Sequence, residues 1–177
     1  MINIITGPMF AGKTTELLRR IERAGHAGMR TVLIGHVCDT RYSMAEVVSH
    51  GGLHVPCIKL DNLRDLKDAS DYDVIGVDEG QFFDDLVSTV DKWADEGRTV
   101  VVAALDGDSN GAPFGHVAEL LCRAEGVDKL TAVCRVCRGN AAFTVATIEG
   151  ATGVGGAEKY KPVCRKCRRE NRGRCKS

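Results

Sequence analysis

The chain has 177 residues, of which 44% are hydrophobic, and this is enough apolar material to bury a real core. Its 24 Lys and Arg balance 24 Asp and Glu, so the composition does not support an overall basic surface built to hold nucleic acid. Only 5% of the residues are aromatic, which argues against a surface that stacks successive bases. The N-terminus lacks the basic and apolar regions of a signal peptide, and no run approaches the ~18 apolar residues of a membrane span. We therefore expect a cytoplasmic protein with no membrane partner.

The formal charge is unevenly distributed along the chain. Residues 159–177 carry a net charge of +8, and residues 1–158 carry −8. We expect an acidic body with a basic C-terminal end.

Short apolar runs alternate with helical patterns through the first two thirds of the chain. We predict strands over 2–6, 31–35, 73–77 and 99–105, and helices over 13–25, 84–96 and 117–124. The run VVVAAL has no polar alternation, as expected for a parallel strand that is covered on both faces. The predicted fold is therefore α/β, with a mostly parallel sheet and helices on both faces.

Two regions depart from this pattern. Residues 36–72 are irregular, and we predict only a turn near 50–52 and a short helix over 60–69. From about residue 131 the chain becomes rich in Cys and Gly. We expect two domains: an α/β domain over 1–130, and a small domain over 131–177 that ends in the basic tail.

A phosphate-binding loop is predicted at the start of the chain. The sequence GPMFAGKT fits G-x-x-x-x-G-K-[ST] between a predicted strand and a predicted helix. In such a loop the backbone N–H groups converge on phosphate oxygens at a helix N-terminus. Lys13 is expected to neutralise the β- and γ-phosphates of ATP, and Thr14 to bind Mg²⁺. The alternative is a chance Gly-rich turn with a surface lysine. The candidate phosphate-binding residues are Gly7, Pro8, Met9, Phe10, Ala11, Gly12, Lys13 and Thr14.

Two adjacent carboxylates follow the predicted strand at 73–77. Because side chains alternate along a strand, Asp78 and Glu79 can face different groups. We assign Asp78 to Mg²⁺, through water, and Glu79 to accepting the proton of an attacking hydroxyl. A solvated acidic turn is the alternative. Asp106, which also follows a predicted strand, is a weaker candidate for the same cluster.

Four cysteines form two C-x-x-C pairs, Cys134 with Cys137 and Cys164 with Cys167. This pattern predicts a zinc ribbon in which four thiolates close a tetrahedral shell and leave no place for water. The zinc is therefore expected to be structural. Unrelated thiols or a redox pair are the alternatives.

A glycine-rich stretch lies between the two pairs, at residues 150–156. Four glycines in seven residues are costly to order, which favours a mobile loop over a stabilising element. Such a loop, closed at its base by zinc, could cover a small substrate during phosphoryl transfer. A disordered linker is the alternative.

Across nearly its whole length the chain resembles the zinc-containing thymidine kinases of cells and poxviruses, often called type II. The resemblance rests on GPMFAGKTTELLRR, DTRYS, VDEGQFF, AALDG with a following PFG, KLTAVCRVC and GGAEKYKPVCRKC, in that order. Members of this family transfer the γ-phosphate of ATP to the 5′-hydroxyl of deoxythymidine, often accept deoxyuridine, and use Mg²⁺. They are commonly tetrameric and inhibited by thymidine triphosphate. For this chain the resemblance implies a homotetrameric salvage kinase in the cytoplasm, the host's if the source is a virus.

The resemblance also implies site residues, position by position. Phosphates would be approached by Asp39, Thr40, Arg41, Asp78 and Gln81, and Glu79 stands where the family has its catalytic base. The nucleoside pocket would be lined by Met9, Gln81, Phe82, Leu105, Phe114 and Thr144, with Gly153, Val154 and Gly155 at the base edge and Tyr160 near the sugar. One departure is Ser109, which stands where relatives usually carry an aromatic that helps to sandwich the base.

Two other functions are compatible with parts of the pattern. A P-loop ATPase whose zinc ribbon and basic tail bind nucleic acid is the first, although sparse aromatics and zero net charge make nucleic acid an improbable partner. A nucleotide-binding regulator without turnover is the second, and the intact Asp78-Glu79 pair disfavours it.

Overall fold

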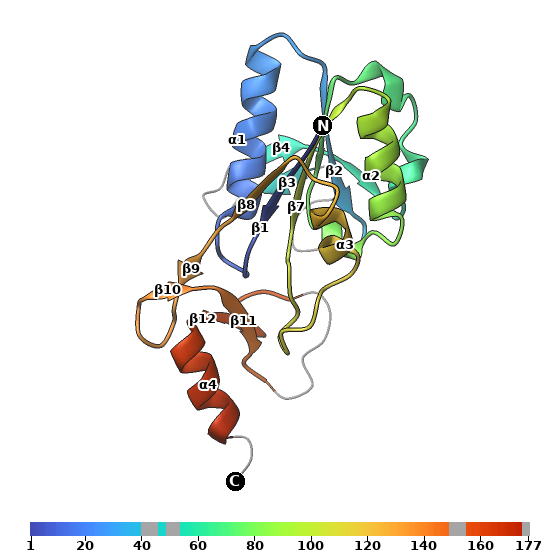
Figure 1. Ribbon diagram of the computed structural model, residues 1–177. Helices are drawn as coiled ribbons and strands as arrows, with labels where there is room; N and C mark the ends of the chain where they lie inside the picture. Colours follow the sequence, from blue (N-terminus) through green and yellow to red (C-terminus); the bar gives the residue numbers. More distant parts are fainter. Residues whose placement is uncertain (40–45, 49–53, 149–154, 175–177) are drawn as a thin grey trace.

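A six-stranded parallel sheet forms the centre of the molecule (Figure 1). The structure is a computed structural model that describes residues 1–39, 46–48, 54–148 and 155–174. The strands lie in the order β5-β2-β6-β7-β1-β8, and all pairings in this sheet are parallel. Their bounds are β1 Ile2–Thr6, β2 Thr31–His36, β5 Ile58–Leu60, β6 Val74–Val77, β7 Thr99–Ala104 and β8 Gly126–Lys129. The predicted strands are therefore confirmed to within a residue at each end.

Helices cover both faces of the sheet and create two separate cores (Figure 1). On one face α1 (Lys13–His26) packs Leu17, Leu18 and Ile21 against β1, β2, β6 and β7. On the other, α2 (Leu86–Asp95) and α3 (Val117–Leu121) contribute the larger core, which includes Trp93. Because the central strands β2, β6, β7 and β1 are buried on both sides, their sequences show little polar alternation. The predicted α/β fold is confirmed.

The register of the central strands brings their carboxyl ends to one edge. Thr6 in β1 lies beside Ala104 in β7, and Val77 in β6 lies beside Val102 in β7. Since the strands are parallel, the segments that follow them all leave the sheet at this edge. These segments contain the GPMFAGKT loop, the Asp78-Glu79 pair and the residues after Leu105.

The chain after β8 forms small sheets and a helix beside this edge (Figure 1). Strands β9 (Ala132–Val133) and β10 (Asn140–Ala141) form one antiparallel pair, and β11 (Phe143–Ala146) and β12 (Tyr160–Val163) form another. Helix α4 (Arg165–Arg174) follows. A further pair, β3 (Glu46–Val48) with β4 (His54–Pro56), lies earlier in the chain. None of the helices described here has both the length and the apolarity needed to cross a membrane.

The helix predicted over 60–69 is wrong. This part of the chain instead forms two short 3₁₀ turns, η1 (Leu63–Asp65) and η2 (Ala69–Asp71), which are separated by the extended Leu66 and a turn with Asp68 in the left-handed region. The carboxylate of Asp85 accepts hydrogen bonds from the backbone N–H groups of Leu63, at 3.0 Å, and Arg64, at 2.9 Å. A distant side chain thus satisfies the donors that begin η1 and fixes the turn against α2. The predicted turn near 50–52 lies outside the described residues.

Asp85 supplies a testable link between this turn and stability. It is buried, and burial by itself would raise its pKa, but the N–H groups of Arg64 and Leu63 and the Thr89 hydroxyl outweigh burial and lower the pKa below its ordinary value. A lowered pKa means that the ionised form stabilises the fold above the unfolded pKa of about 3.9, and that this contribution disappears as pH falls through the folded value.

We expect Asp85→Asn to lower the free energy of unfolding by about 2 kcal/mol at pH 7, because an amide N–H₂ would face backbone donors. Urea unfolding of this variant should be compared with that of Asp84→Asn, an exposed neighbour. The difference in the free energy of unfolding between Asp85→Asn and the parent protein should become smaller below about pH 4. A difference that stays constant down to pH 2.5 would contradict the assigned role of the carboxylate.

Candidate active site

The GPMFAGKT segment forms a tight loop between β1 and α1. Gly7 has a φ of 134°, and a Cβ there would lie 2.3 Å from the carbonyl oxygen of Leu130. Only glycine fits so close an approach with this backbone conformation. Helix α1 then begins directly at Lys13. The strand–loop–helix setting that the sequence predicted for a phosphate-binding loop is present.

Asp78 from the end of β6 meets Thr14 from the start of α1. The Thr14 hydroxyl lies 3.1 and 3.2 Å from the two carboxylate oxygens of Asp78, which is buried. Lys13 donates to the carbonyl of Pro8 at 2.8 Å, within the same loop. A hydroxyl beside a carboxylate is an oxygen-rich pair of the kind that binds Mg²⁺ next to phosphates. These residues therefore fit the predicted metal.

Glu79 points to a different set of groups from its neighbour. It has a φ of 53°, in the left-handed region, so the chain turns sharply after Asp78. Its carboxylate accepts from the Gln81 side-chain amide at 2.5 Å, and the oxygen of that amide accepts from the N–H of Leu105 at 2.9 Å. Glu79 and Gln81 are thereby connected to the loop that follows β7.

Two further contacts join the predicted nucleoside-side residues. The hydroxyl of Thr144, on β11, accepts from the N–H of Met9 in the phosphate-binding loop at 2.9 Å. The rings of Phe82 and Phe114 pack edge to face with centroids 5.6 Å apart. The structure therefore brings Met9 together with Thr144, and Phe82 together with Phe114.

His36 was missed by sequence analysis. It is buried at the end of β2, where its ring lies 5.8 Å from that of Phe82 and 4.7 Å from that of Phe83. Burial lowers its pKa, although Asp61 acts in the opposite direction. Its Nδ1 accepts from the N–H of Cys38, just before Asp39. The residues next to His36 in the sequence give no sign that its ring packs against Phe82 and Phe83, because both lie more than forty positions later in the chain.

A cleft of about 230 Å³ lies between the phosphate-binding loop and the loop after β7. Pro8, Asp106, Lys129 and Thr144 are among the residues that line it. Asp106 forms an ion pair with Lys129 at the end of β8. This ion pair places Asp106 with Lys129 on the wall of the cleft, and its membership of the Asp78–Glu79 cluster stays a prediction.

The remaining predicted site residues fall in or near segments that are only partly described. Asp39 is buried, and its carbonyl accepts from Lys59 at 3.4 Å. Tyr160 is buried on β12, which raises the pKa of its hydroxyl, and Gly155 lies just before the turn that leads to it. The predictions for Thr40, Arg41, Gly153 and Val154 lie outside the described residues.

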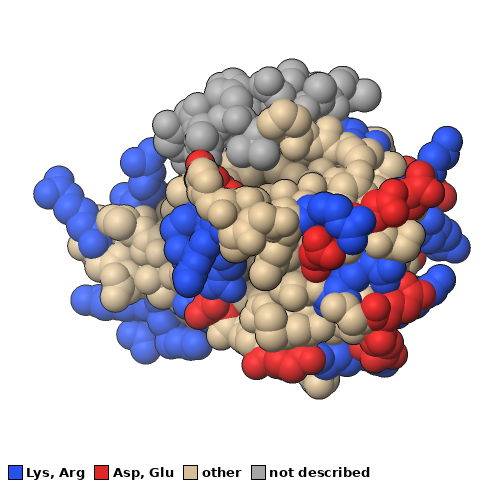
Figure 2. All heavy atoms as spheres, turned by 90° about the horizontal axis from the view of Figure 1, so that it is seen from above, with Lys and Arg blue, Asp and Glu red and all other residues tan. Residues whose placement is uncertain are grey.

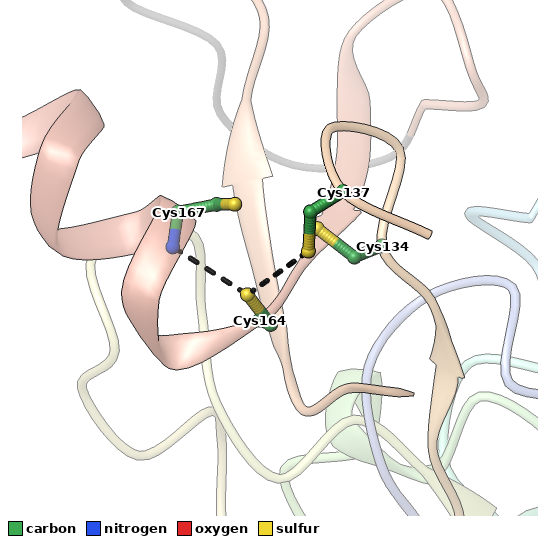
Figure 3. Close-up of side chains that lie close together, drawn as sticks. All are labelled: Cys134, Cys137, Cys164 and Cys167. Carbon is green, nitrogen blue, oxygen red and sulfur yellow. Dashed lines mark hydrogen bonds between the residues drawn. The ribbon is translucent and has the colours of Figure 1, made fainter. Parts of the chain in front are cut away.

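The four C-x-x-C cysteines converge on one point (Figure 3). Their sulfur atoms all lie within 4.8 Å of one another, and those of Cys137 and Cys164 are 3.6 Å apart. A tetrahedral zinc with Zn–S bonds of about 2.3 Å requires sulfur separations of about 3.8 Å. The cluster therefore has the donor set and the spacing of a four-cysteine zinc site.

The electrostatics of the cluster also favour a cation. Burial opposes ionisation of Cys134, but backbone N–H groups of Cys137, Cys164 and Val136 outweigh it and lower the Cys134 pKa. Burial and the neighbouring sulfurs raise the pKa of Cys167. The Cys134 thiol therefore ionises readily, whereas the sulfurs around Cys167 oppose its ionisation. A divalent cation at the centre would offset the repulsion between the negatively charged sulfurs.

The charge asymmetry seen in the sequence is also visible on the surface. Lys and Arg dominate one end of the molecule in Figure 2, whereas acidic and basic residues are mixed at the other end. The part of the chain after β8, which we call the C-terminal segment, exposes several basic residues: Arg135, Arg138, Arg165, Lys166 and Arg169.

Comparison with known proteins agrees with this geometry. The model of the family described as Thymidine kinase matches residues 1–168. The chain is 44% identical to thymidine kinase 1 of Dictyostelium discoideum, over 94% of this chain and 76% of that protein. It is 43% identical to the thymidine kinase of Yaba monkey tumor virus, over 94% and 93% respectively. Identity to the human protein named cytosolic thymidine kinase is 44%, over 94% and 72%.

We expect removal of one sulfur ligand to release the metal. Cys137→Ser should lower bound zinc from about one per chain to near zero, because three thiolates bind zinc far more weakly than four. The thermal midpoint should fall at the same time. Cys122→Ser, an exposed cysteine outside the cluster, is the matched control and should keep its zinc. Full zinc content in Cys137→Ser, measured by elemental analysis, would refute the site.

Proposed function

Because the chain belongs to the thymidine kinase family, we propose that it transfers the γ-phosphate of ATP directly to the 5′-hydroxyl of deoxythymidine, and also accepts deoxyuridine. The observation that carries the proposal is that one sheet edge holds both a phosphate-binding loop and a separate acid. Asp78 contacts Thr14 on the phosphate side, while Glu79 contacts Gln81 on the other side. Nucleic-acid binding is not favoured, since the similarity to thymidine kinases covers nearly the whole chain.

On the phosphate side, residues 7–14 would hold the triphosphate through backbone N–H groups, with charge from Lys13. Thr14 and Asp78 would hold Mg²⁺, which neutralises phosphate charge when bound. We place Asp39, Thr40, Arg41 and Gln81 close to the phosphates as well. The buried position of Asp39 at the carboxyl end of β2 supports this placement.

On the acceptor side, Glu79 would orient the 5′-hydroxyl and accept its proton as the phosphoryl group transfers. The hydrogen bond from Gln81 fixes one oxygen of the Glu79 carboxylate and so orients the carboxylate group. No covalent intermediate on the protein is required, because the two substrates meet at one edge of the sheet.

The nucleoside would lie between the phosphate-binding loop and the loop after β7. We assign its pocket to Met9, Gln81, Phe82, Leu105, Phe114 and Thr144, with Gly153, Val154 and Gly155 at the base edge and Tyr160 near the sugar. The Met9–Thr144 and Phe82–Phe114 contacts support a single pocket. A pocket that satisfies the polar edge of a pyrimidine excludes a purine by size and by unpaired groups.

The same proposal covers the domain organisation, the oligomeric state and the regulation of the protein. We propose a nucleotide-binding domain over 1–130 and a zinc-binding lasso domain over 131–177. The end of the main sheet at Lys129 and the separate small core around Cys134 and Cys167 support this division. We further propose a homotetramer in the cytoplasm that thymidine triphosphate inhibits. A reducing compartment suits the four thiolates of the zinc site.

The direct test is a steady-state assay of zinc-loaded protein with Mg-ATP and each deoxynucleoside in turn. We expect thymidine-selective formation of the monophosphate, with deoxyuridine second and purine deoxynucleosides inactive, because the purine ring exceeds the pocket. ATP hydrolysis that depends on nucleic acid, without nucleoside phosphorylation, would contradict the proposal.

Glu79→Gln tests the assignment of the base. The amide keeps an oxygen that can accept from Gln81 but cannot take a proton, so kcat should fall by about 10²–10⁴-fold. ATP binding, measured by calorimetry, should not change. Glu119→Gln removes an exposed carboxylate from α3 and is the matched control. Turnover within tenfold of the parent protein would exclude Glu79 as the base.

A further inference from the structure

Arg168 on helix α4 contacts the loop that follows β7. Arg168 Nη2 donates to the backbone carbonyl of Asn110 at 2.6 Å. Asn110 lies in the segment 105–116, between β7 and α3, which we call the β7–α3 loop. The two residues are 58 positions apart in the chain, so this is a long-range contact between the C-terminal segment and the loop after β7.

The guanidinium of Arg168 is held in place by the C-terminal segment. Its Cζ lies 4.5 Å from the centroid of the Phe143 ring, and the Cζ of Arg165 lies 4.8 Å from the same centroid. Phe143 belongs to β11 and pairs with Val163 in β12. A planar guanidinium over an aromatic ring is both attracted and oriented, so its donors point in a fixed direction.

The β7–α3 loop is shaped to receive this side chain. A Cβ on Gly111 would lie 1.8 Å from Arg168 Nη2, and Gly111 has a φ of 85°. The Asp108 carboxylate accepts from the N–H groups of Asn110, at 2.9 Å, and Ala112, at 2.8 Å. These bonds fold the tip of the loop into a compact turn whose carbonyl Arg168 contacts.

Both ends of the same loop touch the proposed acceptor side. At its start, Leu105 donates to Gln81, which in turn donates to Glu79. At its end, Phe114 packs against Phe82. A displacement of the loop therefore moves the groups around the nucleoside. Ser109, in the middle of the loop, offers no ring that could pack there and restrain it.

We propose that Arg168 is a positioning residue that clamps the β7–α3 loop to the C-terminal segment and so sets the affinity for the nucleoside. The effect on affinity rests on the function proposed above, whereas the clamp itself does not. Arg168 directly follows Cys167, so the zinc site would hold the base of the clamp in place.

Hydrogen exchange tests the clamp without any substrate. In zinc-loaded protein the amides of Asp108, Gly111 and Ala112 are hydrogen-bonded within the loop and report on its opening. Arg168→Ala should speed their exchange by at least tenfold and leave β7 unchanged. Arg169→Ala removes the same charge from the next, exposed position and should have no effect. Equal exchange in the two variants would overturn the proposal, even if the parent protein proved not to phosphorylate thymidine.

Kinetics test the consequence for the nucleoside. Arg168→Ala should raise the KM for thymidine about 5- to 20-fold, the range expected for loss of one charge-assisted hydrogen bond, with kcat and the KM for ATP within twofold. The KM for thymidine of Arg168→Lys should lie between those of the parent protein and Arg168→Ala, because lysine keeps the charge but lacks the planar group. Zinc content must match that of the parent protein in each variant. An unchanged KM for thymidine, or equal losses in kcat and in the affinity for ATP, would overturn the positioning role.

Discussion

Parallel pairing of β6, β7 and β1 is the constraint on which the site depends. The register places Thr6 beside Ala104, so β1 and β7 end at the same level, and β6 ends close to them. Parallel strands send every following segment out at the same edge. The phosphate-binding loop, the two carboxylates and the β7–α3 loop, which are far apart in the chain, therefore become neighbours. Antiparallel pairing in this sheet would send some of these segments to the opposite edge.

The C-terminal segment contacts this edge from two directions. The Thr144 hydroxyl accepts from Met9 in the phosphate-binding loop, and Arg168 donates to Asn110 in the β7–α3 loop. The small core around Cys134 and Ala141 has few apolar residues, and a metal bound by the cysteine cluster would supply the stabilisation that such a core lacks. Such a metal would therefore bear on the geometry of both proposed substrate sides.

The features that could be predicted from the sequence are sites whose residues lie close together in the chain. The GPMFAGKT loop and the C-x-x-C pairs are of this kind, and the structure places both as predicted. Pairings between distant residues could not be predicted. Asp106 follows β7 much as Asp78 follows β6, yet it forms an ion pair with Lys129 of β8, two strands away in the sheet. The helix predicted over 60–69 is wrong for a similar reason. Asp85, some twenty residues later, accepts hydrogen bonds from the N–H groups that begin a 3₁₀ turn.

The division of labour between Asp78 and Glu79 shows how backbone conformation refines a sequence pattern. Side-chain alternation along a strand was the expected cause of their different directions. The strand, however, ends at Val77, and Glu79 has a φ of 53°. A non-glycine residue in the left-handed region is strained and persists only where its surroundings hold it. The hydrogen bond from Gln81, itself tied to Leu105, provides that restraint. The direction of the proposed base is therefore set through Gln81 by Leu105, directly after β7, whereas Arg168 contacts the loop five residues further on, at Asn110.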